Sequence, residues 1–243
     1  MKLGTIGYGS IGKSMSEVFE DLGFTLSGFY DPNISGSIPL ESVIENADVI
    51  HLASPTKYHL EQAKMVYASL KPCLFEKTFT ATIDKLEEYE DFFFDNNWTV
   101  MVHFISPFMT NYDRVIDKVK SSNCDEVKSL SVYGGWGDLV SWKTNFEESS
   151  GPVVEVGSHG VYAAMDASNG DFSKVKSTEV TVDPSVGHDV YIGTDSLEKI
   201  NDAANHFLTS AKHFADCLLE DKPFKVDRRI AFEAAKKALE FAK

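Results

Sequence analysis

The sequence predicts an α/β fold: an N-terminal doubly wound parallel sheet followed by a reduced α+β C-terminal domain. In about the first 120 residues, short apolar segments alternate with helix-like segments, which is typical of a parallel sheet with helices on both faces. Further along, apolar and polar residues alternate as they do in strands with one exposed face. We place the domains at residues 1–118 and 119–243. The C-terminal helices could also pack back on the first domain.

The elements of the first domain follow from local patterns. Strands are expected over 3–6, 25–30, 48–53, 73–75 and 99–104, and helices over 11–22, 40–45, 58–70 and 83–96. The third helix shows the reasoning, because its apolar residues recur at spacings of three and four. These residues are Leu60, Ala63, Val66, Tyr67 and Leu70. Pro72 then ends the helix, since proline cannot continue the hydrogen-bond ladder.

The second domain is predicted with fewer elements. Strands are expected over 127–133, 175–182 and 191–194, and amphipathic helices over 203–219 and 229–242. Between residue 194 and the first of these helices we expect no strand, so the second sheet should be small.

Composition excludes several classes of function. The net charge of −14 argues against nucleic acid and anionic membranes as partners, because both require clustered lysine and arginine. Three widely spaced cysteines predict neither a disulfide framework nor a metal site, and they fit the reducing cytoplasm. The chain opens without a signal-peptide pattern, and no apolar segment approaches the roughly 20 residues of a membrane helix.

A glycine-rich loop directly follows the first predicted strand, in the sequence Gly7-Tyr8-Gly9-Ser10-Ile11-Gly12. Gly7 suits a tight turn, Gly9 lets the backbone approach a pyrophosphate, and Gly12 permits close contact between helix and strand. The helix that begins here offers N–H groups to phosphates. Strand, loop and helix together predict a Rossmann domain that binds a nicotinamide dinucleotide through all six residues.

Asp31 ends the second predicted strand, 19 residues after Gly12. A carboxylate there accepts hydrogen bonds from the adenosine ribose hydroxyls and repels a 2′-phosphate. We therefore expect NAD as cofactor in preference to NADP. The structural alternative is an ordinary turn followed by a surface aspartate.

Two further motifs resemble a known family. Ala53-Ser54-Pro55-Thr56-Lys57-Tyr58-His59 follows the third strand, and Phe75-Glu76-Lys77-Thr78 follows the fourth. They resemble the A-T-P-N-x-x-H and E-K-P signatures of the Gfo/Idh/MocA family, named for glucose–fructose oxidoreductase, inositol dehydrogenase and rhizopine catabolism. Glu155-Val156-Gly157-Ser158-His159 resembles the D-x-G-x-H motif of that family, and Tyr191-Ile192-Gly193-Thr194 its G-T strand.

The resemblance implies roles for these residues. Ser54, Pro55, Thr56 and His59 would line the cofactor, with Glu76 near the nicotinamide ribose. Lys77 would bind the cofactor and polarise the substrate hydroxyl, and His159 would exchange the hydroxyl proton with Glu155 beside it. This chemistry suits a hydride transfer, which needs a base with a pKa near the working pH and a cation at the developing alkoxide. No metal is implied.

The sequence also departs from the family pattern. Thr78 replaces proline, which should loosen the turn that aims Lys77; Glu155 replaces aspartate; and Tyr162 stands where many members have a second aspartate. Structural alternatives stay open: Lys77 could be solvated, His159 a core or capping residue, Glu155 solvent-facing, and His59 a helix cap. Family members often dimerise through the second sheet, so a homo-oligomer is also open.

The sequence therefore predicts a shortened family member: a cytoplasmic NAD(P)-dependent oxidoreductase acting on a sugar, sugar derivative or cyclitol carbinol. A second hypothesis is a non-catalytic sensor of NAD(H) or a sugar nucleotide. A third is a reductase of another bond on the same fold, which would not need Glu155 and His159. Trp136 and Trp142 could border a sugar pocket or anchor a loop.

Overall fold

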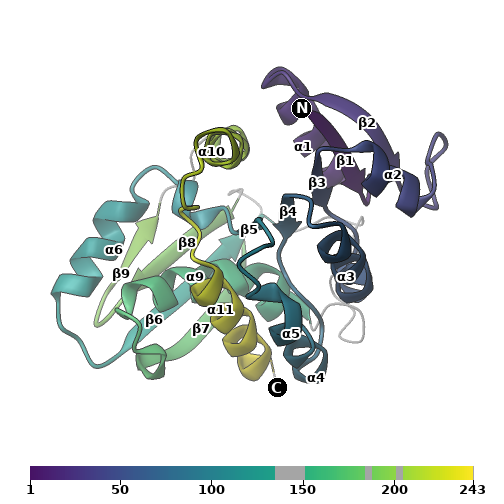
Figure 1. The fold of residues 1–243 in the computed structure, drawn as a ribbon. Coiled ribbons are helices and arrows are strands. Elements are labelled where there is room, and N and C mark those ends of the chain that lie inside the picture. Colours follow the sequence, from purple (N-terminus) through teal and green to yellow (C-terminus); the bar gives the residue numbers. More distant parts are fainter. Residues whose placement is uncertain (135–150, 184–187, 201–204, 243) are drawn as a thin grey trace. The chain divides into compact units, whose positions relative to one another are not determined.

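The computed structural model describes residues 1–134, 151–183, 188–200 and 205–242 (Figure 1). The chain forms two compact units, which are described separately. Unit 1 comprises Met1–Thr80, Asp84–His103 and Phe207–Lys225, and unit 2 comprises Ala81–Ile83, Phe104–His206 and Val226–Lys243.

Unit 1 contains a parallel sheet in the order β2-β1-β3-β4-β5. Its strands are β1 (Lys2–Ile6), β2 (Thr25–Tyr30), β3 (Val49–Leu52), β4 (Cys73–Glu76) and β5 (Val100–His103). The predicted doubly wound sheet is confirmed. The chain leaves β1 toward β2 on one side and later returns to β3 on the other. This change of direction lies between β1 and β3, and α/β proteins bind ligands at the carboxyl ends of the strands beside such a point.

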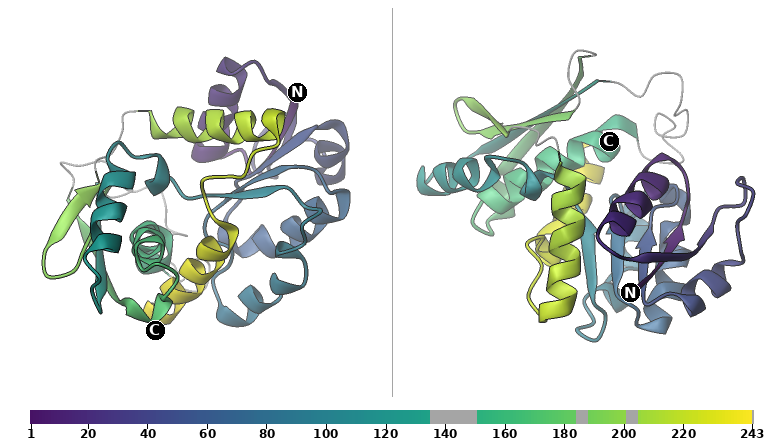
Figure 2. Two further views of the ribbon diagram at one scale, coloured as in Figure 1. Left: turned by 60° about the vertical axis from the view of Figure 1, so that its left-hand side comes forward. Right: turned by 90° about the horizontal axis from the view of Figure 1, so that it is seen from above.

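Helices cover both faces of this sheet. They are α1 (Ser10–Asp21), α2 (Leu40–Asn46), α3 (His59–Ser69), α4 (Ile83–Glu87), α5 (Glu90–Phe93) and α10 (His206–Glu220), with a 3₁₀ turn at Thr56–Tyr58. Thr5 contacts Ser16 of α1, whereas the adjacent Gly4 faces α2, and neighbouring strand residues point to opposite faces. The rings of Phe19 in α1 and Phe214 in α10 lie 6.3 Å apart, so α10 shares the face of α1 (Figure 2).

The single helix predicted over 83–96 is wrong, because the segment breaks into α4 and α5. Tyr89 stands at the break with its side chain fully buried. Its hydroxyl donates to the carbonyl oxygen of Phe79 at 2.7 Å, and its ring contacts Phe75 and Phe93. Burying this ring in an aromatic core is favoured over continuing one regular helix.

Unit 2 contains a mixed sheet in the order β7-β6-β8-β9. Its strands are β6 (Val127–Tyr133), β7 (Val175–Val182), β8 (His188–Gly193) and β9 (Leu197–Ile200). β6 pairs in parallel with β7 and antiparallel with β8, and β9 pairs antiparallel with β8. The expectation of no strand after residue 194 is wrong, because the turn after Gly193 returns the chain as β9.

The helices that support this sheet in the described part of unit 2 are α6 (Tyr112–Ser121), α9 (Ser158–Ala167) and α11 (Arg228–Phe241). α9 packs on β6, β7 and β8, and α11 packs on α9. Gly160 brings α9 close to β6, since a β-carbon there would lie 3.0 Å from the Ser131 hydroxyl and 3.1 Å from Ser129. A π-helical turn, Val153–Gly157, leads directly into α9.

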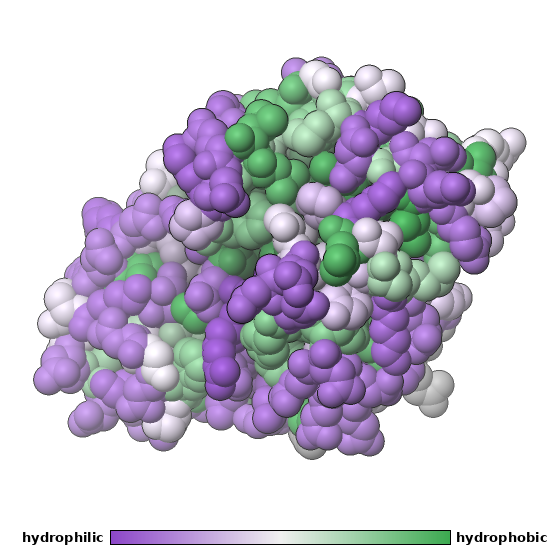
Figure 3. All heavy atoms as spheres, in the orientation of Figure 1, coloured by the Kyte–Doolittle hydropathy of each residue, from purple (hydrophilic) through white to green (hydrophobic). Residues whose placement is uncertain are grey.

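The face drawn in Figure 3 is largely polar. Hydrophilic side chains cover much of the face in Figure 3, with apolar residues interspersed. Within the described residues, no helix combines the length and apolarity that a membrane crossing requires. The same part of the chain contains no group of three or more histidine, cysteine or acidic residues able to hold a metal ion.

Candidate functional site

The glycine loop joins β1 to α1 at the carboxyl end of β1. Gly7 has a positive φ of 86°, and a β-carbon there would lie 2.4 Å from the backbone of Ser54. A β-carbon on Gly12 would lie 1.9 Å from the carbonyl oxygen of Gly7. Both positions therefore exclude larger residues, because the clashing atoms belong to the backbone.

Gly9 differs from these two glycines, since a β-carbon there would meet nothing within 4 Å. It precedes α1, which has no side-chain cap and no acidic residue in its first turn. The helix therefore presents uncapped N–H groups and a partial positive charge beside an open space. This arrangement fits the pyrophosphate of a dinucleotide; the binding itself stays a prediction.

Asp31 lies next to this loop in a fixed orientation. Its Oδ2 accepts a hydrogen bond from the backbone N–H of Tyr8 at 3.0 Å, and its Oδ1 accepts one from the N–H of Asn33 at 3.0 Å. The Tyr8 ring stacks on Phe29, with centroids 4.0 Å apart. The carboxylate thus points toward the glycine loop, as an acceptor of ribose hydroxyls requires.

His59 ties together the loops that follow β3 and β4. Its ring nitrogens lie 2.6 Å from the carbonyl oxygen of Ser54 and 2.7 Å from that of Thr78. The Ser54 hydroxyl donates to Gln62 in α3. Thr78 is buried, and the peptide bond that joins it to Lys77 is cis. His59 therefore fixes the backbone on the carboxyl side of Lys77, where the sequence predicts a loosened turn.

Glu76 occupies the carboxyl end of β4 between two buried histidines. Its Oε1 lies 2.6 Å from Nδ1 of His103 and 3.1 Å from Nε2 of His51. Burial alone would raise the pKa of the Glu76 carboxyl, but His103 and His51 hold that pKa well below its ordinary value. Nε2 of His103 contacts the Ser210 hydroxyl at 2.8 Å. Sequence reasoning missed these partners, because strand register is not visible in the sequence.

This low pKa predicts an acid sensitivity that depends on Glu76. In the unfolded chain the carboxyl takes up its proton near its ordinary pKa of 4.5, whereas in the folded chain it stays ionised. The stability it contributes is therefore present above about pH 4.5 and is lost as the pH falls below it. We expect Glu76→Gln to flatten the acid limb of the unfolding free energy by up to one proton, about 1.4 kcal/mol per pH unit.

Urea unfolding from pH 6 to pH 3 measures this slope. Glu87→Gln is the matched control, because Glu87 is an exposed glutamate of α4 in the same unit. Equal slopes for the Glu76 variant and the wild type would contradict the assignment.

Glu155 and His159 lie in unit 2, one turn apart at the junction of the π-helical turn and α9. Both side chains are buried, at 2% and 5% exposure, so the solvent-facing alternative for Glu155 is wrong. The His159 ring meets Phe104 edge-on at 5.7 Å and His188 at 4.9 Å. π-helical turns within helices are frequent at functional sites. Glu76 and Lys77 belong to unit 1, so the convergence of all four residues stays a prediction.

Tyr162 is a core residue of unit 2. Its ring stacks on Phe104 with centroids 4.7 Å apart, and its hydroxyl accepts the backbone N–H of Asp227 at 3.2 Å. Burial, foremost, raises the pKa of the Tyr162 hydroxyl far above its usual range. Tyr162 therefore joins α9 to the start of α11 and supplies no acid or base.

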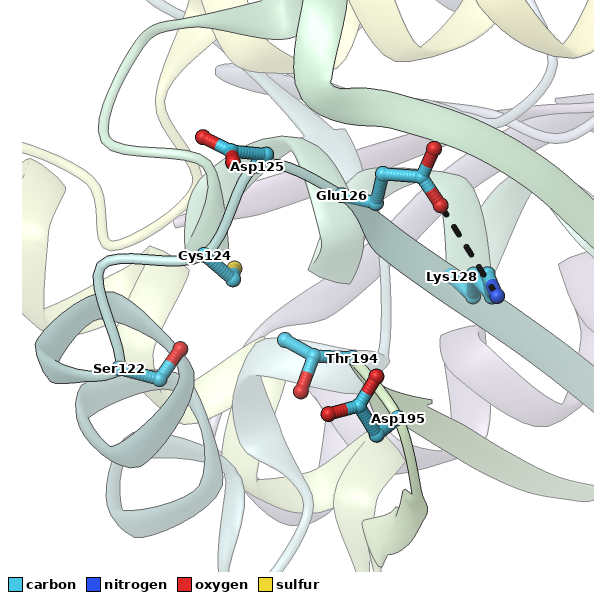
Figure 4. Close-up of a pocket in the computed structure, with 7 residues that line it drawn as sticks. All are labelled: Ser122, Cys124, Asp125, Glu126, Lys128, Thr194 and Asp195. Carbon is cyan, nitrogen blue, oxygen red and sulfur yellow. Dashed lines mark ion pairs between the residues drawn. The ribbon is translucent and has the colours of Figure 1, made fainter.

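A depression of about 520 Å³ lies on unit 2 where α6 leads into β6 and β8 turns toward β9 (Figure 4). Its lining is mostly polar and acidic, with an ion pair of 4.0 Å between Glu126 and Lys128. The lining residues are Ser122, Cys124, Asp125, Glu126, Lys128, Thr194 and Asp195. They include no site residue predicted from the sequence. Trp136 and Trp142 lie outside the described residues.

Comparisons with known proteins show the fold of the chain. No protein-family model and no curated protein matches its sequence. Three similar solved structures are, in order, WlbA (WbpB) dehydrogenase from Thermus thermophilus with NAD and UDP-GlcNAcA, UDP-N-acetylglucosamine 3-dehydrogenase GnnA from Acidithiobacillus ferrooxidans, and dehydrogenase MviM from Clostridium difficile. Their TM-scores are 0.78, 0.71 and 0.68, at 15%, 12% and 18% identity.

The alignments cover 100%, 99% and 99% of this chain and 95%, 96% and 97% of those chains. All three neighbours are described as dehydrogenases. The likeness confirms the fold that the sequence motifs predict.

Proposed function

We propose that the protein is an NAD-dependent oxidoreductase that transfers a hydride between the cofactor and a carbinol of a sugar, sugar derivative or cyclitol. The observation that carries the proposal is the glycine loop, in which an open Gly9 faces the uncapped N-terminus of α1 beside an oriented Asp31. The WlbA and GnnA structures agree with it, since their names give NAD, a sugar nucleotide and a dehydrogenase activity.

The residues of unit 1 would hold the cofactor. The N–H groups at the start of α1 would bind the pyrophosphate, and Asp31 would bind the adenosine ribose. Glu76, at the carboxyl end of β4, would accept a hydrogen bond from the nicotinamide ribose. When bound, NAD supplies the hydride acceptor.

The remaining residues handle the proton and charge of the carbinol. His159 takes the hydroxyl proton as the hydride leaves, because imidazole has a pKa near neutrality in its unperturbed form. Lys77 would stabilise the negative charge that develops on the carbinol oxygen. Glu155, one turn before His159, orients the ring and stabilises its protonated form. For reduction of a carbonyl, the proton moves from His159 to the oxygen.

The first experiment is a titration of the protein with NADH, followed by fluorescence, and then a search for NAD reduction across a panel of polyols, sugars and sugar nucleotides. Saturable NADH binding with turnover on one member supports the proposal. Binding without turnover on any member would favour the sensor hypothesis, and the absence of NADH binding would overturn both.

Cofactor preference provides a second test, through Asp31. We expect the wild type to bind NADH more tightly than NADPH, because the carboxylate repels a 2′-phosphate. Asp31→Asn keeps an oxygen for the Tyr8 N–H but loses the charge. It should lower the ratio of the NADPH to the NADH dissociation constant by about tenfold, the scale of one charge-assisted hydrogen bond. An unchanged ratio would remove Asp31 from the binding site.

A further inference from the structure

Glu76 uses one carboxylate oxygen for the protein and leaves the other open. His51 and His103 both contact Oε1, while Oε2 makes no hydrogen bond to the protein within the described residues. The histidine side chains are 0% and 1% exposed, whereas Glu76 keeps 13%. The carboxylate is therefore anchored from the interior and accessible at its outer edge.

Strand register creates this anchor. Glu76 of β4 pairs directly with His103 of β5. His51 of β3 pairs with Leu74, which lies two residues before Glu76 and points to the same face. From α10, Ser210 contacts the far nitrogen of His103. Within the described residues, the titratable groups that act on Glu76 are the two histidines.

Ser210, His103 and Glu76 are connected in the order in which a catalytic triad connects its nucleophile, base and acid. They do not form a nucleophilic site. Ser210 is fully buried, so no substrate reaches its hydroxyl. That hydroxyl also lies 3.0 Å from the carbonyl oxygen of Phe207, one turn earlier in α10, and can donate to it. Ser210 instead holds the His103 ring, whose Nδ1 then faces Glu76.

We propose that His51 and His103 are positioning residues, which keep Glu76 charged and present its Oε2 to a ribose hydroxyl at the nicotinamide end of the cofactor. This inference rests on the proposed function. Its physical basis is that a buried carboxyl without partners takes up a proton, and a neutral carboxyl has lost most of its strength as an acceptor. Two donors on one oxygen also fix the plane in which the second oxygen lies.

The test exploits the different nitrogens that the two histidines use. Counted in bonds from Cβ, an asparagine amide nitrogen replaces Nδ1 and a glutamine amide nitrogen replaces Nε2. His103→Asn and His51→Gln therefore keep the donor to Glu76, whereas His103→Gln and His51→Asn misplace it. NADH and ADP dissociation constants are measured for all four variants from pH 5 to pH 8. ADP lacks the nicotinamide ribose, so its binding reports the fold and the adenosine half alone.

We expect the two misplaced-donor variants to weaken NADH binding about tenfold at pH 7, and the two matched variants to weaken it less than about threefold. ADP affinity should stay unchanged in all four. In the misplaced-donor variants, NADH affinity should also fall further as the pH drops toward 5, because Glu76 there takes up a proton more readily. Ser210→Ala, which leaves the Nδ1 contact in place, is a milder variant that should resemble the matched pair.

The outcomes separate this inference from the proposed function. The positioning role would be overturned if the two variants at each histidine bound NADH equally well. Parallel losses of NADH and ADP binding would overturn it too. In both cases NADH binding by the wild type would still support the proposed function. A wild type that binds no NADH would overturn the proposed function and this inference together. If both variants of one histidine fail to fold, the pair at the other position and Ser210→Ala still decide the question.

Discussion

Replacing His159 with alanine should lower kcat by a factor of about 10² to 10⁴, which is the usual contribution of a positioned acid or base. The dissociation constant of NADH should stay within about threefold of the wild-type value.

Lys77→Ala should lower kcat by about 10² to 10³, because a preorganised cation at the developing alkoxide is lost. The two side chains belong to different units. Similar losses of turnover in both variants would therefore indicate that the units cooperate in one reaction.

Two control variants separate catalysis from folding. Tyr162→Phe removes a hydroxyl that contacts the backbone of Asp227 in the core, so it should cost stability and little turnover. Lys57→Ala removes an exposed lysine near the loop after β3 and should leave kcat unchanged. Steady-state kinetics and NADH titration on the same preparations provide the comparison. Wild-type turnover in His159→Ala and Lys77→Ala would refute their roles.

Three strands, β2, β6 and β7, begin and end where the sequence predicts. In β6, buried residues alternate with more exposed ones, which is the pattern that predicts a strand with one exposed face. α6 carries a clear apolar stripe of Tyr112, Val115, Ile116 and Val119, so its absence from the prediction was avoidable. α9 was not predicted either, but here the pattern gives no signal, because nearly all residues of this helix are buried. Without an exposed face a helix shows no amphipathic period.

Local chemistry also explains the smaller errors. The last helix starts at Arg228 rather than Arg229, because the Asp227 side chain caps it by accepting the N–H of Ile230 at 2.8 Å. β9 has only four residues and follows a tight turn, so its apolar pattern is too short to predict. Such ends depend on single hydrogen bonds rather than on periodicity.

In the candidate site, too, the sequence predicts local features and misses contacts between residues that lie far apart in the chain. The glycine loop and Asp31 are local in sequence, and their spacing alone predicts a turn, a helix start and a carboxylate beside them. The partners of Glu76 are not local: His51 and His103 lie 25 and 27 residues away. Both histidines fall on predicted strands, but a shift of one residue in register would turn either side chain to the other face. The contact therefore required the structure.

Alanine at Gly12 and alanine at Gly9 should differ in their effect on stability. Gly12→Ala places a β-carbon 1.9 Å from the Gly7 carbonyl oxygen and 3.3 Å from Thr5. The helix must then move away from β1, which we expect to cost about 1–3 kcal/mol of stability and to abolish NADH binding. Gly9→Ala meets no atom within 4 Å at a φ of −71°, which an alanine adopts readily, so stability should change by less than about 1 kcal/mol.

Gly9→Ala should nevertheless weaken NADH binding by tenfold or more, because its methyl group enters the space where the pyrophosphate approaches the backbone. Urea unfolding and NADH titration of both variants separate the two effects. If the loop is only a structural turn that binds no ligand, Gly12→Ala should lower stability and Gly9→Ala should have no effect. A dinucleotide site predicts that both lose the cofactor while only Gly12→Ala loses stability. If Gly9→Ala bound NADH with full affinity, the protein would bind the cofactor, but the pyrophosphate would not lie at Gly9.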